Sequence, residues 1–521
     1  MITKWKLSNF KSVRKETELP FAPLTIFAGA NSSGKSSWIQ SILMISQTLA
    51  HRISSRSVVL NGVLSRLGQF DDLRSFDSEM PGIVIGWECR PWIDQGQVGA
   101  LFPAHRTPSG VRQFENIKSV CCEISFDAAP SPPEPETSQL HPSLVSTTLS
   151  CISKDEEGNA IGSRVKISRT DNFNQKVSGL TIPISSQETQ NKILQQSLEF
   201  DVSLDDPSID EIHENLASAL VVGCLLRHFL PMRLTARIDS VDERARILGY
   251  VVSTGRARPQ RAMNASEQDI VFPKAIVDLL KQHLGPSFPI PPETEMQGDI
   301  PHDHPAAREL TLRDWTDAMR KLSPIQQYRL RDQLRGIAGL YELIVEAATK
   351  GKEKEFVLRF IGIPDQISEA TSYLDTFFSN FISYLGPLRD EPKPLYPLPT
   401  SPDLAYVGLK GEYTAAVLDL HKNRYVEYIP PSCFQGATAQ KQVSSNFLQR
   451  AVSDWLQYLG VAESVHTHDM GKLGHELRVQ TPGIQKSHDL THAGVGVSQV
   501  LPILVNCVVL PTNLDSQGLV F

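Results

Sequence analysis

The sequence predicts an α/β fold that has a parallel core sheet, an antiparallel β subdomain and a mainly helical insertion. Three observations lead to this prediction: a strand, a glycine-rich loop and a helix follow one another near the N-terminus, strand patterns dominate 83–205, and helical spacing dominates 206–380. Strand and helix patterns both return after that stretch. We therefore expect an N-terminal lobe, an antiparallel β-rich region, a helical insertion and a C-terminal lobe, at 1–82, 83–205, 206–380 and 381–521.

The N-terminal lobe is predicted to begin with two strands and a helix. Polar and apolar residues alternate in "ITKWKLSNF" (2–10), and the apolar run "LTIFA" (24–28) suits a buried parallel strand. From Lys35 onwards, apolar side chains recur at helical intervals, at Trp38, Ile42, Ile45 and Leu49. The chain is therefore expected to pass from a buried strand to an amphipathic helix across a glycine-rich turn.

Periodicity and capping residues predict the later elements. A hairpin is expected around "EEGN" (156–159), and the N-cap Asp206 predicts a helix that runs to about Leu230. A long helical stretch over 309–350 is broken near Ser323, which precedes a proline. In the C-terminal lobe we expect a strand, an amphipathic helix, a polar hairpin and an apolar helix, at 381–392, 443–460, 466–476 and 498–510.

Composition argues against several classes of protein. The formal net charge is −7, from 51 basic and 58 acidic residues, so no chain-wide positive field attracts nucleic acid, and any DNA contact must come from a local patch. The 7 cysteines are scattered and form no CxxC pair, which argues against a disulfide framework or a zinc ribbon. No signal peptide and no bilayer-spanning apolar run is evident, so we expect a cytoplasmic protein without membrane contact.

The strongest functional motif is "GANSSGKSS" (29–37), which satisfies the P-loop pattern GxxxxGK[ST]. Between a strand and a helix, such a loop points backbone N–H groups at phosphate oxygens. Lys35 would meet the β- and γ-phosphates of ATP, and the Ser36 hydroxyl would ligate Mg²⁺. A glycine–serine loop that only caps a helix is the competing interpretation. The expected nucleotide-binding residues are Gly29, Ala30, Asn31, Ser32, Ser33, Gly34, Lys35, Ser36 and Ser37.

A second glycine motif, "HAGVGVSQVLPIL" (492–504), opens the last predicted helix. Its glycines precede a first turn that tolerates Pro502, because the first N–H groups of a helix have no helical partner. We interpret this motif as a second anion site. A glycine-capped core helix is the alternative. The expected ligand-binding residues of this site are Gly494, Gly496, Ser498 and Gln499.

Five blocks of the chain resemble a known family in sequence and in order. They are "LSNFKS" (7–12), "LNGVLSRLGQFDDL" (60–73), "YLGPLRDEP" (384–392), "VGLKGEYTAAVL" (407–418) and the second glycine motif (492–504). Together with the P-loop they resemble the ABC-like AAA ATPases of the RecF, SMC and OLD-type group, which serve DNA repair, chromosome handling and phage defence. The resemblance implies a P-loop NTPase fold of the ABC-type head.

The resemblance also implies site roles. In such heads the signature motif of one subunit binds the γ-phosphate held by the P-loop of the other, so two heads close around two ATP molecules. By the same resemblance Lys35 and Gln69 are catalytic, and Ser36 and Gln69 hold Mg²⁺. A glutamine in a surface turn is the competing interpretation of Gln69. Arg389, in the third block, is expected to reach either a phosphate or an acidic partner, with a structural ion pair as the alternative.

The signature departs from the familiar "LSGGQ", which leaves open whether Gly494, Gly496 or Ser498 makes the contact. The resemblance makes "GLVF" (518–521) the Walker B strand, after which acidic residues order Mg²⁺ and polarise water. The 521-residue sequence stops at this strand, before such acidic residues, so we expect it to bind ATP but to hydrolyse it slowly.

The implied function is an ATP-binding head whose dimerisation, or assembly into a higher oligomer, controls a nuclease or another effector in phage defence or DNA repair. DNA stays open as a further ligand. The alternative is a nucleotide-gated scaffold that binds ATP and a partner protein with negligible hydrolysis.

Overall fold

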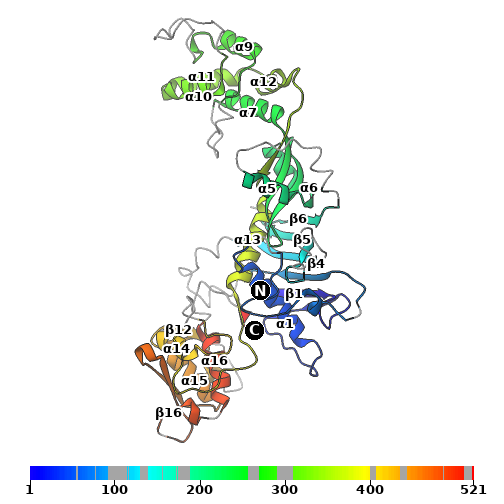
Figure 1. Cartoon of the computed structure of the whole chain (residues 1–521). Coiled ribbons are helices and arrows are strands. Elements are labelled where there is room, and N and C mark those ends of the chain that lie inside the picture. Colours follow the sequence, from blue (N-terminus) through cyan, green and yellow to red (C-terminus); the bar gives the residue numbers. More distant parts are fainter. Residues whose placement is uncertain are drawn as a thin grey trace.

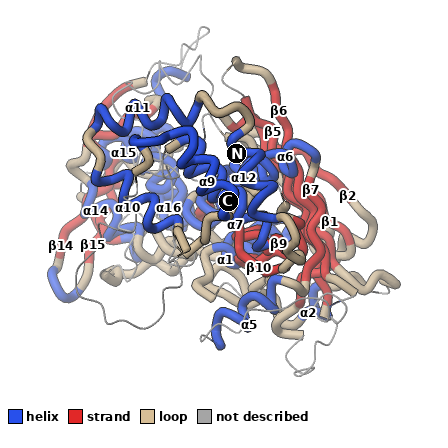
Figure 2. The backbone as a smooth tube through the Cα atoms, turned by 90° about the horizontal axis from the view of Figure 1, so that it is seen from above, coloured by secondary structure: helices blue, strands red, loops and turns tan. Residues whose placement is uncertain are grey.

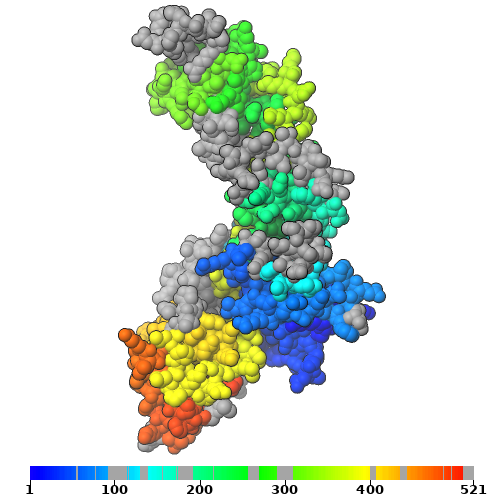
Figure 3. Space-filling model, in the orientation of Figure 1, coloured from blue at the N-terminus to red at the C-terminus, as the bar shows by residue number. Residues whose placement is uncertain are grey.

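The computed structural model describes most of the chain and shows an elongated molecule (Figures 1 and 3). A sheet lies in the middle, a helical lobe at one end and the C-terminal lobe at the other. The residues outside the description are 54–56, 77, 92–113, 115, 129–138, 155–156, 172, 174–187, 217, 256–268, 290–308, 399–405, 435–442, 485, 494, 510–518 and 521. No helix in the described residues is long and apolar enough to cross a bilayer.

An antiparallel sheet of seven strands forms the middle of the molecule, in the order β2-β1-β3-β4-β5-β6-β7. Figure 2 shows several of its strands side by side. The predicted antiparallel strands of 83–205 are therefore confirmed, although two strands of the predicted N-terminal lobe, β1 and β2, belong to the same sheet. The hairpin β5–β6 around the predicted turn is confirmed as well. The strands are β1 (Ile2–Ser8), β2 (Thr17–Pro20), β3 (Ile83–Cys89), β4 (Ile117–Asp127), β5 (Ser143–Lys154), β6 (Ala160–Arg169) and β7 (Phe200–Leu204).

Two helices, α1 (Lys35–Leu49) and α13 (Asp365–Asn380), cover one face of this sheet. Trp5 and Trp87 are opposite each other on β1 and β3 and stack with ring centroids 5.3 Å apart. Trp5 donates its indole N–H to Ser41 Oγ of α1 at 2.9 Å, and Phe378 of α13 packs against both tryptophans. The helix predicted from Lys35 is confirmed, and burial of these large aromatic rings fixes it on the sheet.

Residues 24–28 do not form a strand, so this prediction is wrong. Leu24 and Ile26 are each 78% exposed. A parallel strand needs a neighbour that accepts and donates its backbone hydrogen bonds, and no described strand pairs with this segment. The parallel pairing within the described residues joins only β11 (Ile382–Ser383) to β17 (Leu519–Val520). The large sheet is antiparallel, and the expected parallel core sheet is not among the sheets described.

The stretch 206–380 is less helical than predicted. Helix α6 (Asp206–Asn215) is capped by Asp205, whose side chain accepts from Ser208 N, and it ends well before Leu230. The chain then forms the hairpin β8–β9, because apolar runs such as "LVVGCLL" fit a pleated, half-buried surface as well as a helix. A third strand completes a sheet in the order β10-β9-β8. These elements are α5 (Glu188–Ser197), β8 (Leu220–Arg227), β9 (Leu230–Asp239) and β10 (Phe356–Ile361).

Between β9 and β10 the chain forms the helical lobe, which has its own apolar core around the fully buried Trp315. The predicted break in this stretch is confirmed: Ser323 caps α11, and its side chain accepts a hydrogen bond from Gln326 N. The helices of this lobe are α7 (Ser240–Thr254), α9 (Lys274–Leu284), α10 (Leu312–Lys321), α11 (Pro324–Arg335) and α12 (Leu340–Thr349), with a 3₁₀ turn at Gly285–Ser287.

The C-terminal lobe has a third, separate apolar core. The predicted polar hairpin is confirmed as β14–β15, and both predicted helices are present, although residues 444–447 of the first form strand β13 instead. The elements are α14 (Thr414–His421), β12 (Tyr425–Tyr428), β13 (Ser444–Phe447), α15 (Leu448–Tyr458), β14 (Ser464–Asp469), β15 (His475–Gln480), β16 (His488–Asp489) and α16 (Val495–Val509). The 3₁₀ turns are Pro431–Phe434, Gly471–Leu473 and Leu490–His492.

Candidate functional site

The glycine-rich loop 29–37 leads directly into α1. Gly34 is the N-cap of the helix and has a left-handed backbone with φ 90°, and Ser32 is also left-handed with φ 63°. No side chain caps the first turn of this 15-residue helix. The helix N-terminus therefore presents backbone N–H groups at the loop without a competing side-chain acceptor, which is the arrangement that attracts an anion.

Lys35 lies over this loop. Its ammonium group donates to the carbonyl oxygens of Gly29 at 2.8 Å and of Ala30 at 2.6 Å. Both acceptors belong to exposed residues of the loop itself, so the ammonium group is held where the backbone turns. Ser36, the next residue, is exposed at the start of the helix. A cation and a hydroxyl thus lie beside an open helix N-terminus, and this set of groups fits a phosphate with a metal ion.

The block 7–12 contacts the glycine-rich loop and helix α1. Gly34 has φ +90°, and a Cβ there would lie 2.1 Å from Ser12 Oγ, so the position strongly favours glycine. Lys11 donates its ammonium hydrogen to Gln40 of α1 at 2.6 Å and its backbone N–H to Leu73 O at 2.6 Å. Burial lowers the pKa of Lys11, and the nearby carboxylate of Asp72 opposes this shift. This turn therefore joins the start of α1 to the block that contains Gln69.

Gln69 is the N-cap residue of the short helix α2 (Phe70–Leu73) and is exposed. Its backbone N–H donates to Asp72 Oδ2 at 2.7 Å. The preceding segment is fixed to α1 by Gln47, whose side chain donates to Val59 O at 2.8 Å and accepts from Ser65 N at 3.0 Å. Gln69 therefore occupies a defined turn tied to α1, and its side chain is accessible to a ligand.

The second glycine motif lies in the C-terminal lobe, at the start of α16. Gly494 is outside the described residues. Gly496 and Gln499 are exposed in the first turns of the helix, whereas Ser498 is buried. Pro502 of this helix packs tightly against the block 407–418, since a Cβ on Gly411 would lie 2.6 Å from Pro502 Cγ.

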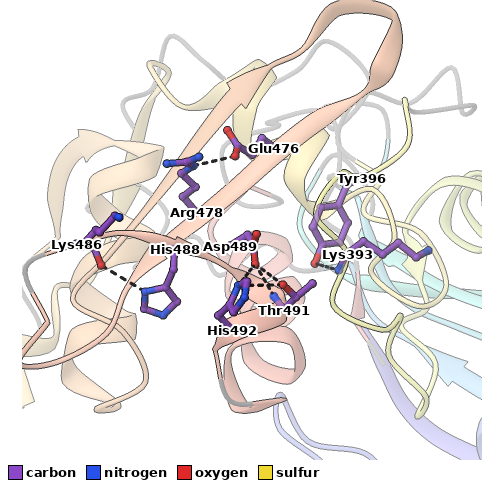
Figure 4. A network of polar contacts seen from close by, with 9 residues as sticks. All are labelled: Lys393, Tyr396, Glu476, Arg478, Lys486, His488, Asp489, Thr491 and His492. Atoms are coloured by element: carbon purple, nitrogen blue, oxygen red, sulfur yellow. Dashed lines mark hydrogen bonds and ion pairs between the residues drawn. The ribbon is translucent and has the colours of Figure 1, made fainter.

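A polar network precedes α16 (Figure 4). The carboxylate of Asp489 accepts from His492 Nδ1 at 2.8 Å, from Thr491 N at 3.2 Å and from the Thr491 hydroxyl. These hydrogen bonds, that of the Thr491 hydroxyl first, lower the pKa of Asp489. Nearby, Lys393 N donates to the hydroxyl of Tyr396 at 3.3 Å. The network orders the chain that leads into the exposed start of the helix.

The structure brings the residues of the P-loop together but keeps the two candidate anion sites in separate lobes. α1 belongs to the core of the central sheet, whereas α16 belongs to the core of the C-terminal lobe. The contributions of Ser12, Gln40 and Gln47 were missed from the sequence. Gln47 was the detectable one, because it is a polar residue on the otherwise apolar face of a helix.

No protein-family model matches the chain, and a search of curated proteins likewise finds no match. Within the described residues, no group of three or more histidine, cysteine, aspartate or glutamate side chains is placed to hold a metal ion. The sequence blocks and the geometry of the loop are therefore the observations that bear on function.

Proposed function

We propose that this protein binds ATP with Mg²⁺ on the loop 29–37 and that it is an ABC-like ATPase of the RecF, SMC and OLD-type group. One observation carries the proposal: the uncapped N-terminus of α1 and the ammonium group of Lys35 converge on the same loop. The β- and γ-phosphates of ATP would replace the carbonyls of Gly29 and Ala30 as partners of Lys35, because an anionic phosphate oxygen attracts the ammonium group more strongly than a neutral carbonyl oxygen does.

The other site residues take roles that their positions allow. Ser36 is exposed and offers its hydroxyl to Mg²⁺. Ser32 belongs to the loop and would present its backbone N–H group to a phosphate oxygen. Ser33 N donates to Ala30 O at 3.3 Å and Ser37 N to Gly34 O at 3.0 Å, so these two groups would exchange a carbonyl acceptor for a phosphate oxygen. Gln69 would complete the metal shell and orient the attacking water, since its side chain is exposed on a segment fixed to α1.

We also propose a parallel core sheet in the nucleotide-bound protein. The parallel pair β11–β17 would provide two of its strands. The seven-stranded antiparallel sheet would then be a separate layer beside this core.

Two heads would act together. The exposed start of α16 lies in the C-terminal lobe, whose apolar core is separate from the core that holds α1 and the P-loop. It would therefore be able to contact the nucleotide of a second subunit. ATP binding would close the dimer and control a nuclease or another effector in phage defence or DNA repair. The rate of phosphate release from ATP distinguishes this ATPase cycle from a nucleotide-gated scaffold, which would release almost no phosphate.

Gly496→Arg is expected to block ATP-dependent dimerisation without weakening ATP binding. Gly496 is exposed, and a Cβ built on it meets no atom within 4 Å, so the fold accepts a side chain that the dimer interface does not. Sedimentation velocity with and without ATP and Mg²⁺ measures the effect: the wild type should double in mass, and the variant should stay monomeric.

Gly362→Arg is the matched control for this experiment. Gly362 is also exposed with no atom within 4 Å of a built Cβ, but it precedes α13, away from the second glycine motif. This variant should dimerise like the wild type. An unchanged wild-type mass with nucleotide, or normal dimerisation of Gly496→Arg, would contradict the proposed head dimer.

A further inference from the structure

Arg389 lies where the central sheet region passes into the C-terminal lobe. The block 384–392 follows β11 directly; Ile382 packs against the core of the sheet, whereas Leu385 belongs to the core of the C-terminal lobe. β11 is parallel to β17, and ligands of parallel sheets bind beyond the carboxyl ends of the strands. Arg389 therefore follows the strand end at which a ligand is expected.

The guanidinium group of Arg389 is incompletely paired. Its Nη1 donates to Gly386 O, but its Nε is buried and has no hydrogen-bond partner. The adjacent carboxylate, that of Asp390, is taken by Lys393 at 2.6 Å. Across the part of the chain that the structure describes, Arg389 makes no ion pair. The structural ion pair considered for this residue from the sequence is therefore absent from the described residues.

An unpaired, partly buried guanidinium group is costly. Burial lowers the pKa of Arg389, and the phenol of Tyr384 only partly opposes this shift. Buried polar atoms without partners are rare in proteins, and an absent ion is one of the accepted explanations. Arginine presents a planar fork of N–H donors, which matches the oxygens of a phosphate. The environment of Arg389 is therefore suited to an anion.

The neighbouring turn adds a second cation. Gly386 N donates to Leu409 O at 2.7 Å and Asp390 N to Lys410 O at 2.8 Å, so the two turns are held edge to edge on either side of Arg389. Lys410 is exposed, and its backbone N–H donates to Glu412 Oε2 at 2.7 Å. Its ammonium group belongs to no ion pair that the described residues form. Two cationic residues thus lie on adjoining turns.

We propose that Arg389 is a further phosphate-binding residue, which contacts the terminal phosphate of the bound nucleotide while Lys410 adds positive charge beside it. This inference rests on the proposed binding of ATP by the P-loop. The P-loop would hold the β- and γ-phosphates from one side, and the γ-phosphate has further oxygens that a cation from outside the loop can contact. Because Arg389 lies between two cores, contact with that phosphate would also tell the C-terminal lobe whether ATP or ADP is bound.

Equilibrium titration with ATP and with ADP, each with Mg²⁺, tests this inference. Arg389→Ala should weaken ATP binding by about 10-fold or more, the range expected for a lost hydrogen bond to a charged group, and should change ADP binding by less than about twofold. Arg389→Lys should give an intermediate loss for ATP, because it keeps the charge but not the fork. Arg478→Ala is the matched control, since Arg478 is an arginine of the same lobe that pairs with Glu476 at 2.8 Å.

The outcomes separate this inference from the proposed function. If the wild type binds ATP and Lys35→Ala weakens binding by about 100-fold, but Arg389→Ala keeps the wild-type ratio of ATP to ADP affinity, the inference is overturned and the P-loop assignment stands. If the wild type binds neither nucleotide, both are overturned. If Arg389→Ala weakens binding of a DNA duplex and not of ATP, its phosphate belongs to nucleic acid and the nucleotide assignment fails. Should Arg389→Ala not fold, Arg389→Lys and Arg389→Gln decide by the same ratio.

Discussion

Replacing Lys35 with alanine is expected to lower the affinity for ATP by about 100-fold, the factor that corresponds to losing a charged hydrogen-bonding partner of the phosphates. The hydrogen bonds of its ammonium group go to the exposed loop at Gly29 and Ala30, so its removal leaves the apolar core intact. The free energy of unfolding should therefore change by less than about 0.5 kcal/mol. Isothermal titration with ATP and Mg²⁺, together with urea unfolding, measures both quantities.

Two further variants accompany this experiment. Lys15→Ala removes an exposed lysine from the same lobe outside the P-loop and should bind ATP like the wild type. Lys35→Arg keeps the charge and should lose less affinity than Lys35→Ala. Wild-type affinity for ATP in a normally folded Lys35→Ala protein would show that the loop 29–37 is not the nucleotide site.

Gly474→Ala is expected to destabilise the C-terminal lobe by about 3 kcal/mol, from strain and overpacking together. Gly474 has φ +116°, and a Cβ there would lie 2.1 Å from the carbonyl oxygen of Tyr396. That oxygen accepts from His475 N at 2.9 Å, and Tyr396 N donates to His475 O at the same distance. The backbone at Tyr396 therefore cannot move away without breaking these two hydrogen bonds, which join it to the hairpin β14–β15. Urea unfolding followed by circular dichroism measures the loss.

Gly471→Ala in the same hairpin isolates the contribution of the backbone conformation. Gly471 has φ +61°, and no atom lies within 4 Å of a built Cβ. This variant should lose only about 1 kcal/mol, the cost of a left-handed backbone for a residue with a side chain. Equal losses for the two variants would show that contact with Tyr396 is not what excludes alanine from Gly474.

Elements with a strong local signal could be predicted from the sequence. The alternation in β1 and the helical spacing after Lys35 each follow from which side chains the element buries. The break at Ser323 follows from a side chain that caps a helix next to a proline. The polar hairpin β14–β15 could also be predicted, because its polar turn residues separate two strand-like runs.

Predictions failed where the outcome depends on distant residues. The apolar run in β8 satisfies a helix or a strand equally well, and its pairing with β9 decides between them. "LTIFA" has the composition of a buried strand, but a strand needs a partner, and no described strand pairs with it.

The candidate site divides in the same way. The turn from the glycine-rich loop 29–37 into α1 could be predicted, because the loop and the helix start are contiguous in the chain. The contact of Ser12 with the loop could not be predicted, since only the folded turn brings that hydroxyl against Gly34. The absence of an ion pair at Arg389 could not be predicted either, because Asp390 is its neighbour in the sequence but pairs with Lys393 in the structure.

Hydrogen–deuterium exchange of the wild-type protein, with and without ATP and Mg²⁺, measures whether the loop 29–37 binds the phosphates of ATP. Bound phosphates should accept hydrogen bonds from the loop and the first turn of α1, so peptides that cover 29–37 should exchange more slowly with nucleotide. The hairpin β14–β15 should serve as an internal reference that does not change. We expect slower exchange at 29–37 that disappears in Lys35→Ala, whereas unchanged exchange there at saturating ATP would show that the loop does not hold the phosphates.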